Sequence, residues 1–123
     1  MSLLTAGADL VPVPLHPTRR RQRGFNQAEL LAAALARGSG LAVSPGVLVR
    51  RKDTPPQAGL SSAARRKNVA GAFAVRHRSR VMGRTLVLVD DVTTTGATAG
   101  ACARALMEAG AAEVRLVTAA RVT

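Results

Sequence analysis

The chain has 123 residues and a formal net charge of +11, a length that allows one compact domain with a modest core. Hydrophobic residues make up 47% of the chain but aromatic residues only 2%, so the core has to be built from Ala, Val and Leu, which suits layers of helix on sheet. No apolar run approaches the roughly 20 residues that cross a bilayer, and residues 1–10 lack the basic start and long apolar stretch of a signal peptide. These features exclude a membrane-spanning protein, and we expect a soluble, cytoplasmic one.

Basic residues occur in clusters, and such a positive field attracts polyanions. The polyanion could be a nucleic acid, single-stranded DNA included, or a small polyphosphate held in a cleft, and composition leaves both open. With no Trp or Tyr, and with Phe25 and Phe73 as its two aromatic residues, the chain lacks the platforms on which single-strand binders stack bases. The clusters are Arg19, Arg20, Arg21 and Arg23; Arg50, Arg51 and Lys52; Arg65, Arg66 and Lys67; and Arg76, Arg78, Arg80 and Arg84.

The segment from Asp9 to Leu15 predicts a short strand, in which Pro12 and Pro14 remove two ladder donors and favour a position at a sheet edge or a strand end. A loop from Pro17 to Gly24 follows and carries the first basic cluster. Positive charge is therefore expected next to the end of this strand.

The next segment predicts a helix with a well-marked start. Asn26 is the expected N-cap, Glu29 its reciprocal partner, and Phe25 packs on Leu30 as a hydrophobic staple. An apolar face and a terminating glycine complete the pattern: Leu30, Leu31, Ala34 and Leu35 form the face, and Gly38 or Gly40 ends the helix.

The middle of the chain contains two short strands separated by a long loop. Val47 to Arg51 and Ala72 to Arg76 predict the strands, and Lys52 to Gly71 predicts the loop, with one helical turn near Ser62 to Asn68. Loops of that length inside a compact domain are uncommon and often functional. We therefore expect this loop to serve the function of the protein.

The last third predicts a strand, a helix and a strand. Thr85 to Asp90 and Val114 to Ala119 are apolar runs typical of buried strands, and the helix between them spans about Ala97 to Ala109 and stops at Gly110. Cys102, the single cysteine, can form no internal disulfide and is interpreted as a small buried residue on this helix. The alternation of strands and helices predicts an α/β domain with a mostly parallel central sheet flanked by helices.

The stretch from Val87 to Thr98 carries the clearest chemistry. A buried strand delivers Asp90 and Asp91 to its carboxyl end, where ligands bind in sheets of this kind. A turn with Gly96 then opens a helix whose free amides can hold a phosphate. Carboxylates beside an anion site suit a ligand that also has hydroxyl groups. A ribose phosphate meets both requirements, because its hydroxyls can donate to the carboxylates and its phosphate can bind the helix start. Hydroxyl donors for the phosphate are available from Thr94, Thr95 and Thr98.

Two competing hypotheses for this stretch are weaker. The carboxylates and threonines could simply cap the following helix, but capping needs one such residue and here there are five. The acidic strand end of a nucleotide hydrolase would need a partner loop of the form GxxxxGK[ST], and the chain contains no Gly-Lys pair.

The order of apolar residues, two acids and Thr-Gly-x-Thr in Val87 to Thr98 resembles the motif that binds phosphoribosyl pyrophosphate (PRPP) in type I phosphoribosyltransferases. The resemblance covers nearly the whole chain, from about Asp9 to Arg121. Other segments are similar to the ComF-like branch of that family, named for competence protein F. These segments are Val11 to Pro17, Arg23 to Gln27, Asp53 to Gln57, Arg66 to Asn68 and Gly71 to Phe73.

The resemblance implies a type I fold and a role for each part of the site. It implies that Asp90 and Asp91 are the catalytic residues and hold ribose, with the 5-phosphate on Thr94, Thr95, Gly96, Ala97 and Thr98. It implies that pyrophosphate is bound by His16, Arg19, Arg20, Arg21 and Arg23. It also implies a flexible loop that closes over PRPP with Gln57, Arg65, Arg66 and Lys67. It implies Mg²⁺ as the cofactor, brought by PRPP rather than held by a direct protein ligand. Asn26 could touch the ligand or only cap its helix.

The chain departs from the family pattern at two points. Purine-salvage members carry an Asp where this chain has Thr94, which cannot act as a base, so a purine acceptor is disfavoured. No segment is expected to form the hood that recognises the acceptor, and no cysteine-rich region resembling the family's zinc finger precedes Asp9. The acceptor, and whether the chain is a natural short form or a fragment, stay open.

Two functions follow from these residues. The chain is either a phosphoribosyltransferase for an unidentified acceptor, or a non-catalytic module that binds PRPP, a nucleotide or single-stranded DNA in competence-linked DNA uptake. A homodimer is one alternative for the oligomeric state, and no membrane partner is expected.

Overall fold

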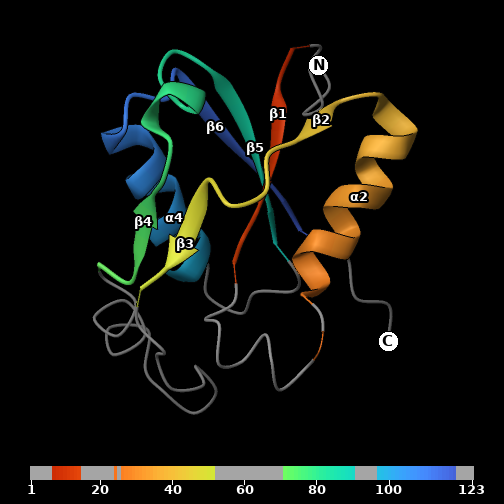
Figure 1. The fold of residues 1–123 in the computed structure, drawn as a ribbon, viewed down its shortest axis with the longest axis horizontal. Helices are drawn as coiled ribbons and strands as arrows, with labels where there is room; N and C mark the ends of the chain where they lie inside the picture. Colours follow the sequence, from red (N-terminus) through yellow and green to blue (C-terminus); the bar gives the residue numbers. More distant parts are fainter. Residues whose placement is uncertain (1–6, 15–23, 25, 52–70, 91–96, 119–123) are drawn as a thin grey trace.

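The computed structural model describes residues 7–14, 24, 26–51, 71–90 and 97–118. Its central sheet has four parallel strands in the order β2-β1-β5-β6 (Figure 1). The strands are β1 (Asp9–Pro12), β2 (Ala42–Val43), β5 (Thr85–Asp90) and β6 (Glu113–Thr118). The mostly parallel α/β sheet predicted from the sequence is thus confirmed.

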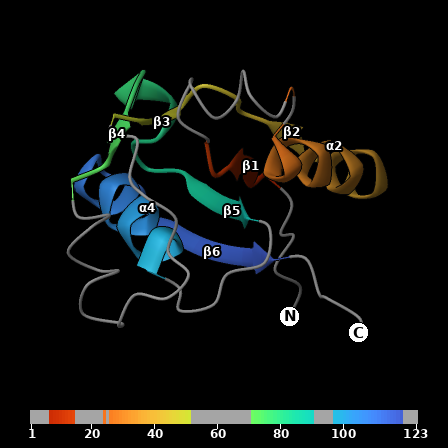
Figure 2. The ribbon, with the colours of Figure 1, turned by 90° about the horizontal axis from the view of Figure 1, so that it is seen from below.

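Both faces of the sheet are covered, which explains the continuous apolar sequence of β5. Leu86 and Leu88 belong to the core on one face, where α4 (Ala97–Glu108) packs, while Val87 and Val89 belong to the core on the other face, under α2 (Gln27–Ser39). Figure 2 shows the two helices on opposite sides of the sheet. All four β5 side chains are at most 1% exposed, so this strand anchors both layers.

A separate antiparallel pair, β3 (Leu48–Arg50) and β4 (Phe73–Val75), lies on the α4 side of the molecule (Figures 1 and 2). Phe73 and Leu48 are buried in the same core as α4 and the α4-facing side of β5. A short 3-10 helix, η1 (Arg78–Arg80), links β4 to β5. The two predicted middle strands therefore exist, but they pair with each other and not with the central sheet.

Several predicted helix boundaries are confirmed. Asn26 caps α2 by accepting a hydrogen bond from the N–H of Ala28, and Gly40 ends the helix in the left-handed conformation at φ 78°. Gly110, with φ 100°, follows the end of α4. None of the helices that the structure describes is long and apolar enough to cross a membrane.

The predicted apolar face of α2 was wrong in part. Leu30 is 56% exposed and Ala34 is also exposed, whereas the buried positions are Ala28 and Ala32, four residues apart on one side of the helix. Small alanines at these positions allow the helix to lie close to the sheet, and the longer side chains of the helix flank this contact. Leu31 and Leu35 are partly buried beside it.

The outer strands also differ from the prediction. The last strand, β6, was expected to be buried, but within the described part of the chain it pairs only with β5, and Leu116 is 40% exposed. The strand β2 was not predicted, because two residues give too short a pattern. Pro12 is the last residue of β1, so the strand-end alternative predicted for it is confirmed. The sheet-edge alternative is not, because β1 lies inside the sheet.

Candidate functional site

The candidate site lies at the carboxyl edge of the central sheet. Asp90 is the last residue of β5, where it pairs in register with Thr118 at the end of β6. The next helix, α4, starts seven positions later at Ala97, with the half-buried Thr98 in its first turn. Figure 1 shows α4 beginning at the end of the molecule where β5 finishes. A carboxylate and a helix start are thus delivered to one edge, as the sequence predicted.

The direction of Asp90 follows from the alternation of β5. Leu86 and Leu88 face the core beneath α4, so Asp90, two residues further on, lies on that same face and not on the α2 face. Its side chain is half-buried. Asp90 is therefore only partly withdrawn from solvent at the sheet edge.

The electrostatics of the buried Cys102 on α4 confirm this placement. Burial raises the pKa of the Cys102 thiol well above its ordinary value of 9.0, and the negative charge of Asp90 raises it further, while the Arg50 guanidinium lowers it. Both charges therefore act on the same thiol. Cys102 is fully buried, as predicted, and its thiol stays neutral and unsuited to nucleophilic chemistry.

Arg50 is a charged residue near the site to which the sequence interpretation assigned no role. It is the last residue of β3, and the carbon of its guanidinium lies 5.1 Å from the ring centroid of Phe73, its partner across the β3–β4 pair. Its Nε atom is buried. The sequence shows only an arginine in a basic cluster, because Phe73 lies 23 positions further along the chain and the fold alone brings the two together.

The side chain of Asn26 has a structural role, shown by its hydrogen bonds within the fold. The amide nitrogen of its side chain donates to the carbonyl oxygen of Val13 at 3.0 Å, and the amide oxygen accepts from the N–H of Ala28 at 3.0 Å. The residue is only 4% exposed. Of the two roles considered for Asn26, ligand contact and helix cap, the structure supports the cap.

The rest of the predicted site lies outside the described residues. This holds for the second acid and the turn that follows it, for the basic loop, and for the long loop. The residues concerned are Asp91, Thr94, Thr95 and Gly96; His16, Arg19, Arg20, Arg21 and Arg23; and Gln57, Arg65, Arg66 and Lys67. Within the ranges that are described, no group of three His, Cys, Asp or Glu side chains is arranged to hold a metal ion.

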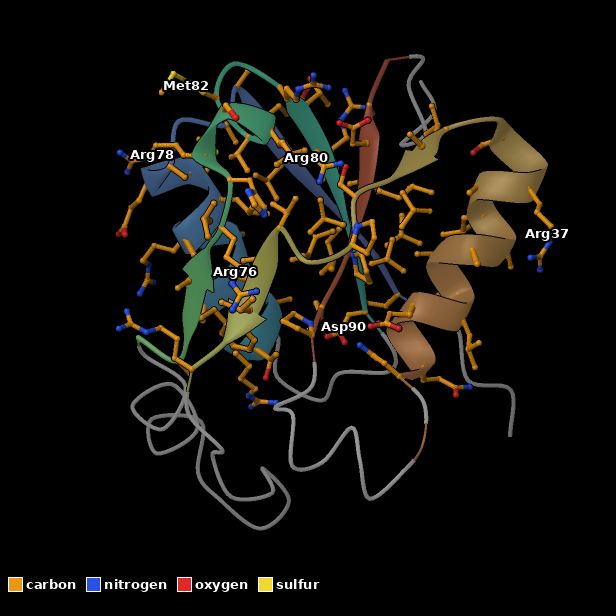
Figure 3. The ribbon with its side chains drawn as sticks, viewed as in Figure 1. Arg37, Arg76, Arg78, Arg80, Met82 and Asp90 are labelled. Carbon is orange, nitrogen blue, oxygen red and sulfur yellow. The ribbon has the colours of Figure 1, made fainter. Side chains whose placement is uncertain are left out.

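Part of one basic cluster lies far from the candidate site. Arg76, Arg78 and Arg80 are exposed on the segment that joins β4 to β5. Figure 3 places Arg78 and Arg80 towards the end of the molecule opposite Asp90. Their exposure is typical of a solvated charged face.

Comparisons with known proteins agree with this geometry. Residues 22–122 match the family model of the phosphoribosyl transferase domain. Relatives include competence protein F of Haemophilus influenzae, 36% identical over 108 residues, and the DNA utilization protein YhgH of Escherichia coli K12, 39% identical over 107 residues. These alignments cover 87% of this chain and 47% and 46% of the relatives, so the chain spans about half the length of the proteins it matches.

A third relative is competence protein ComFC of Bacillus subtilis, 38% identical over 103 residues, with 84% of this chain and 40% of the relative covered. Among solved structures, the allosteric regulatory enzyme of purine biosynthesis matches with a TM-score of 0.62 and 23% identity, over 94% of this chain and 23% of that one. The structural match supports the fold alone. By sequence and fold together, the chain belongs to the phosphoribosyltransferase domain family, in its ComF-like branch.

Proposed function

We propose that the chain binds PRPP and transfers its phosphoribosyl group to an acceptor, with release of pyrophosphate. The observation that carries this proposal is the placement of Asp90 at the carboxyl end of a fully buried strand, at the edge where α4 begins with Thr98 in its first turn. A carboxylate accepts hydrogen bonds from ribose hydroxyls, and the first amides of a helix donate to a phosphate. A ribose 5-phosphate carries both kinds of group in one molecule.

The remaining chemistry concerns the leaving group. Pyrophosphate departs with several negative charges, so cations have to stabilise it, and the arginines from Arg19 to Arg23 are the protein groups proposed for this role. Mg²⁺ bound to PRPP would neutralise part of the same charge. The oxygens of PRPP are proposed to hold the ion. The loop from Lys52 to Gly71 is proposed to close over the ligand and exclude water.

The test is a calorimetric titration of PRPP with and without Mg²⁺, because a chain without Trp and Tyr offers no convenient intrinsic fluorescence. We expect magnesium-dependent binding at micromolar concentrations, lost in the double variant D90N/D91N. The double variant E108Q/E113Q is the matched control, since it removes two exposed carboxylates from the end of α4 and the start of β6, away from Asp90. Unchanged affinity in D90N/D91N would refute the site.

The acceptor is proposed to need no deprotonation by the enzyme, because Thr94 stands where purine-salvage members have an Asp. Candidate acceptors should therefore be screened with ammonia and small amines beside purine bases, following pyrophosphate release. Release with a purine base alone would contradict this part of the proposal.

A second function is favoured by the exposed arginines of the β4–β5 connection and by the name of the relative YhgH, a DNA utilization protein. In this alternative the chain is a non-catalytic module that binds single-stranded DNA. Arg76, Arg78 and Arg80 are exposed, and within the described residues none of them forms an ion pair with a carboxylate.

The DNA alternative is tested with two sets of substitutions. Replacing Arg19 to Arg23 by Ser, or the three arginines of the β4–β5 connection by Gln, should weaken DNA binding and flatten its salt dependence by about 0.7 per lost phosphate contact. Arg78 and Arg80 lie far from Asp90 (Figure 3), so a variant that replaces only these two should leave PRPP binding intact. An unchanged salt slope in both sets would exclude the alternative.

A further inference from the structure

Arg50 is a half-buried arginine whose Nε atom is enclosed by the protein. Its guanidinium stacks over the ring of Phe73 at 5.1 Å, and Phe73 itself is only 7% exposed. The two residues face each other directly across β3 and β4, so the strand pairing fixes the stack. A partly buried charge of this kind is stabilised by nearby rings and opposite charge.

The fold directs Arg50 and Asp90 towards the same place. Arg50 ends β3, and its guanidinium lies over a ring that belongs to the core shared with α4. Asp90 ends β5 on the face that carries Leu86 and Leu88, which belong to that core. The two charges act with opposite sign on the buried thiol of Cys102 in the same core. Each charge therefore reaches the region around Cys102 from its own strand.

We propose that Arg50 is a positioning residue of the ribose-phosphate site, which holds the Asp90 carboxylate oriented towards the ligand. This inference rests on the proposed function and adds a residue to it. Arg50 is not a ligand contact in this account, because it acts through Asp90. Contact with the Phe73 ring orients the guanidinium of Arg50. This orientation sets the side from which Arg50 approaches the Asp90 carboxylate.

The chemistry explains why this position is occupied by arginine. A guanidinium is planar, stays charged at every physiological pH, and can stack on a ring while it donates in its own plane. Lysine keeps the positive charge but has no planar group to stack on the ring. Glutamine keeps a planar polar group but has no charge. The variants R50K and R50Q therefore separate charge from shape, and F73L removes the ring while both charges stay.

The experiment measures Mg²⁺-PRPP affinity in R50Q, R50K and F73L, with R37Q as the matched control. Arg37 is exposed near the end of α2, far from Asp90 in Figure 3, and R37Q removes the same charge. We expect R50Q to lose about tenfold in affinity or more, the size of a lost charged contact. R50K should stay within about threefold of wild type because the charge is kept, and F73L should lose about threefold. R37Q should be unchanged.

A double-variant cycle separates positioning from simple loss of packing. If Arg50 acts through Asp90, R50Q adds little to the affinity loss already caused by D90N, and the melting temperature shifts of R50Q and D90N are also non-additive. Additive losses, or an R50Q affinity within twofold of wild type, would overturn the inference. Should R50Q fail to fold, R50K decides, since a role through charge requires R50K to stay within about threefold of wild type, and a larger loss would overturn the inference.

Failure of the proposed function gives a different result. If wild-type protein shows no PRPP binding, the proposed function fails, and the melting temperatures still report on the pair in the free protein. Non-additive shifts would then show that Arg50 orients Asp90 without that ligand, whereas additive shifts would refute the pairing as well.

Discussion

The side chain of Asn26 joins the start of α2 to the residue that follows β1. Its amide nitrogen donates to the carbonyl oxygen of Val13, and its amide oxygen accepts from the N–H of Ala28, both at 3.0 Å. Val13 also donates its own N–H to the carbonyl oxygen of Val89 on β5, at 2.8 Å. One buried amide thus connects the helix to the strands that lead to the candidate site.

Replacing Asn26 by Ala should destabilise the fold by about 1–3 kcal/mol, because the helix loses its cap and the carbonyl of Val13 loses a buried donor. N26D keeps the cap but cannot donate to Val13, so its free energy of unfolding should fall in between. Urea denaturation measures both values. The control is Q27A, at the exposed first residue of α2. A loss in N26A no larger than in Q27A would contradict this role.

The sequence predicted the elements around the candidate site because each has a local cause. The middle of β5, Leu86 to Val89, is apolar throughout because two layers cover it, and Asn26 and Gly40 carry the chemistry of helix ends. These signals need no knowledge of distant contacts. Local sequence alone therefore predicts that Asp90 ends a strand and that a helix begins shortly after it.

What could not be predicted depends on contacts between distant segments. The burial of Ala28 and Ala32 in place of Leu30 is set by how closely α2 approaches the sheet, and the exposure of β6 by its place at the sheet edge. The contact of Arg50 with Phe73 needs the β3–β4 pairing. Hydrophobicity patterns do not contain these distances, so the sequence did not predict the role proposed for Arg50.

Two glycines of one region should respond to alanine in opposite directions. Gly110 has φ +100°, and a Cβ there would lie 3.1 Å from the Cγ atom of Met82, so G110A should cost about 1–2 kcal/mol. Gly100 lies inside α4 with open space around it, so G100A should add about 0.5–1 kcal/mol. Chemical denaturation of the two variants checks the sign of each change.

The double variant G110A/M82A tests the cause at Gly110. Because the backbone conformation is the larger strain, trimming Met82 should restore little of the lost stability. Full recovery in the double variant would show that the side-chain contact, and not the positive φ, makes glycine necessary.

The ion pair between Arg84 and Asp9 should contribute little despite its 2.9 Å separation. The Arg84 side chain is 51% exposed, so water and salt screen the charges, although Asp9 is only 15% exposed. R84Q is expected to lower the free energy of unfolding by at most about 1 kcal/mol, and by less at high salt. Denaturation at low and high ionic strength measures this. A salt-independent loss would point to packing of the Arg84 stem instead.

Alkaline pH should destabilise the fold through Cys102. Burial raises the pKa of this thiol above its ordinary value of 9.0 in the folded state only. Below pH 9 the thiol is protonated in both states, and its contribution to stability is complete. As the pH rises above that value, the unfolded chain releases the proton and the folded chain keeps it, so the free energy of unfolding falls by about 1.4 kcal/mol per pH unit.

The variant C102V isolates this effect, because valine fills the buried site without a titrating group. Its stability should be flatter above about pH 9 than that of the wild type when urea midpoints are compared between about pH 8 and 10.5. The absence of Tyr removes a group that would titrate in the same range, and Lys52 and Lys67 are present in both proteins, so their contribution cancels in the difference. Equal slopes in the two proteins would mean that the thiol ionises as easily in the folded chain as in the unfolded one, which its burial beside the Asp90 carboxylate argues against.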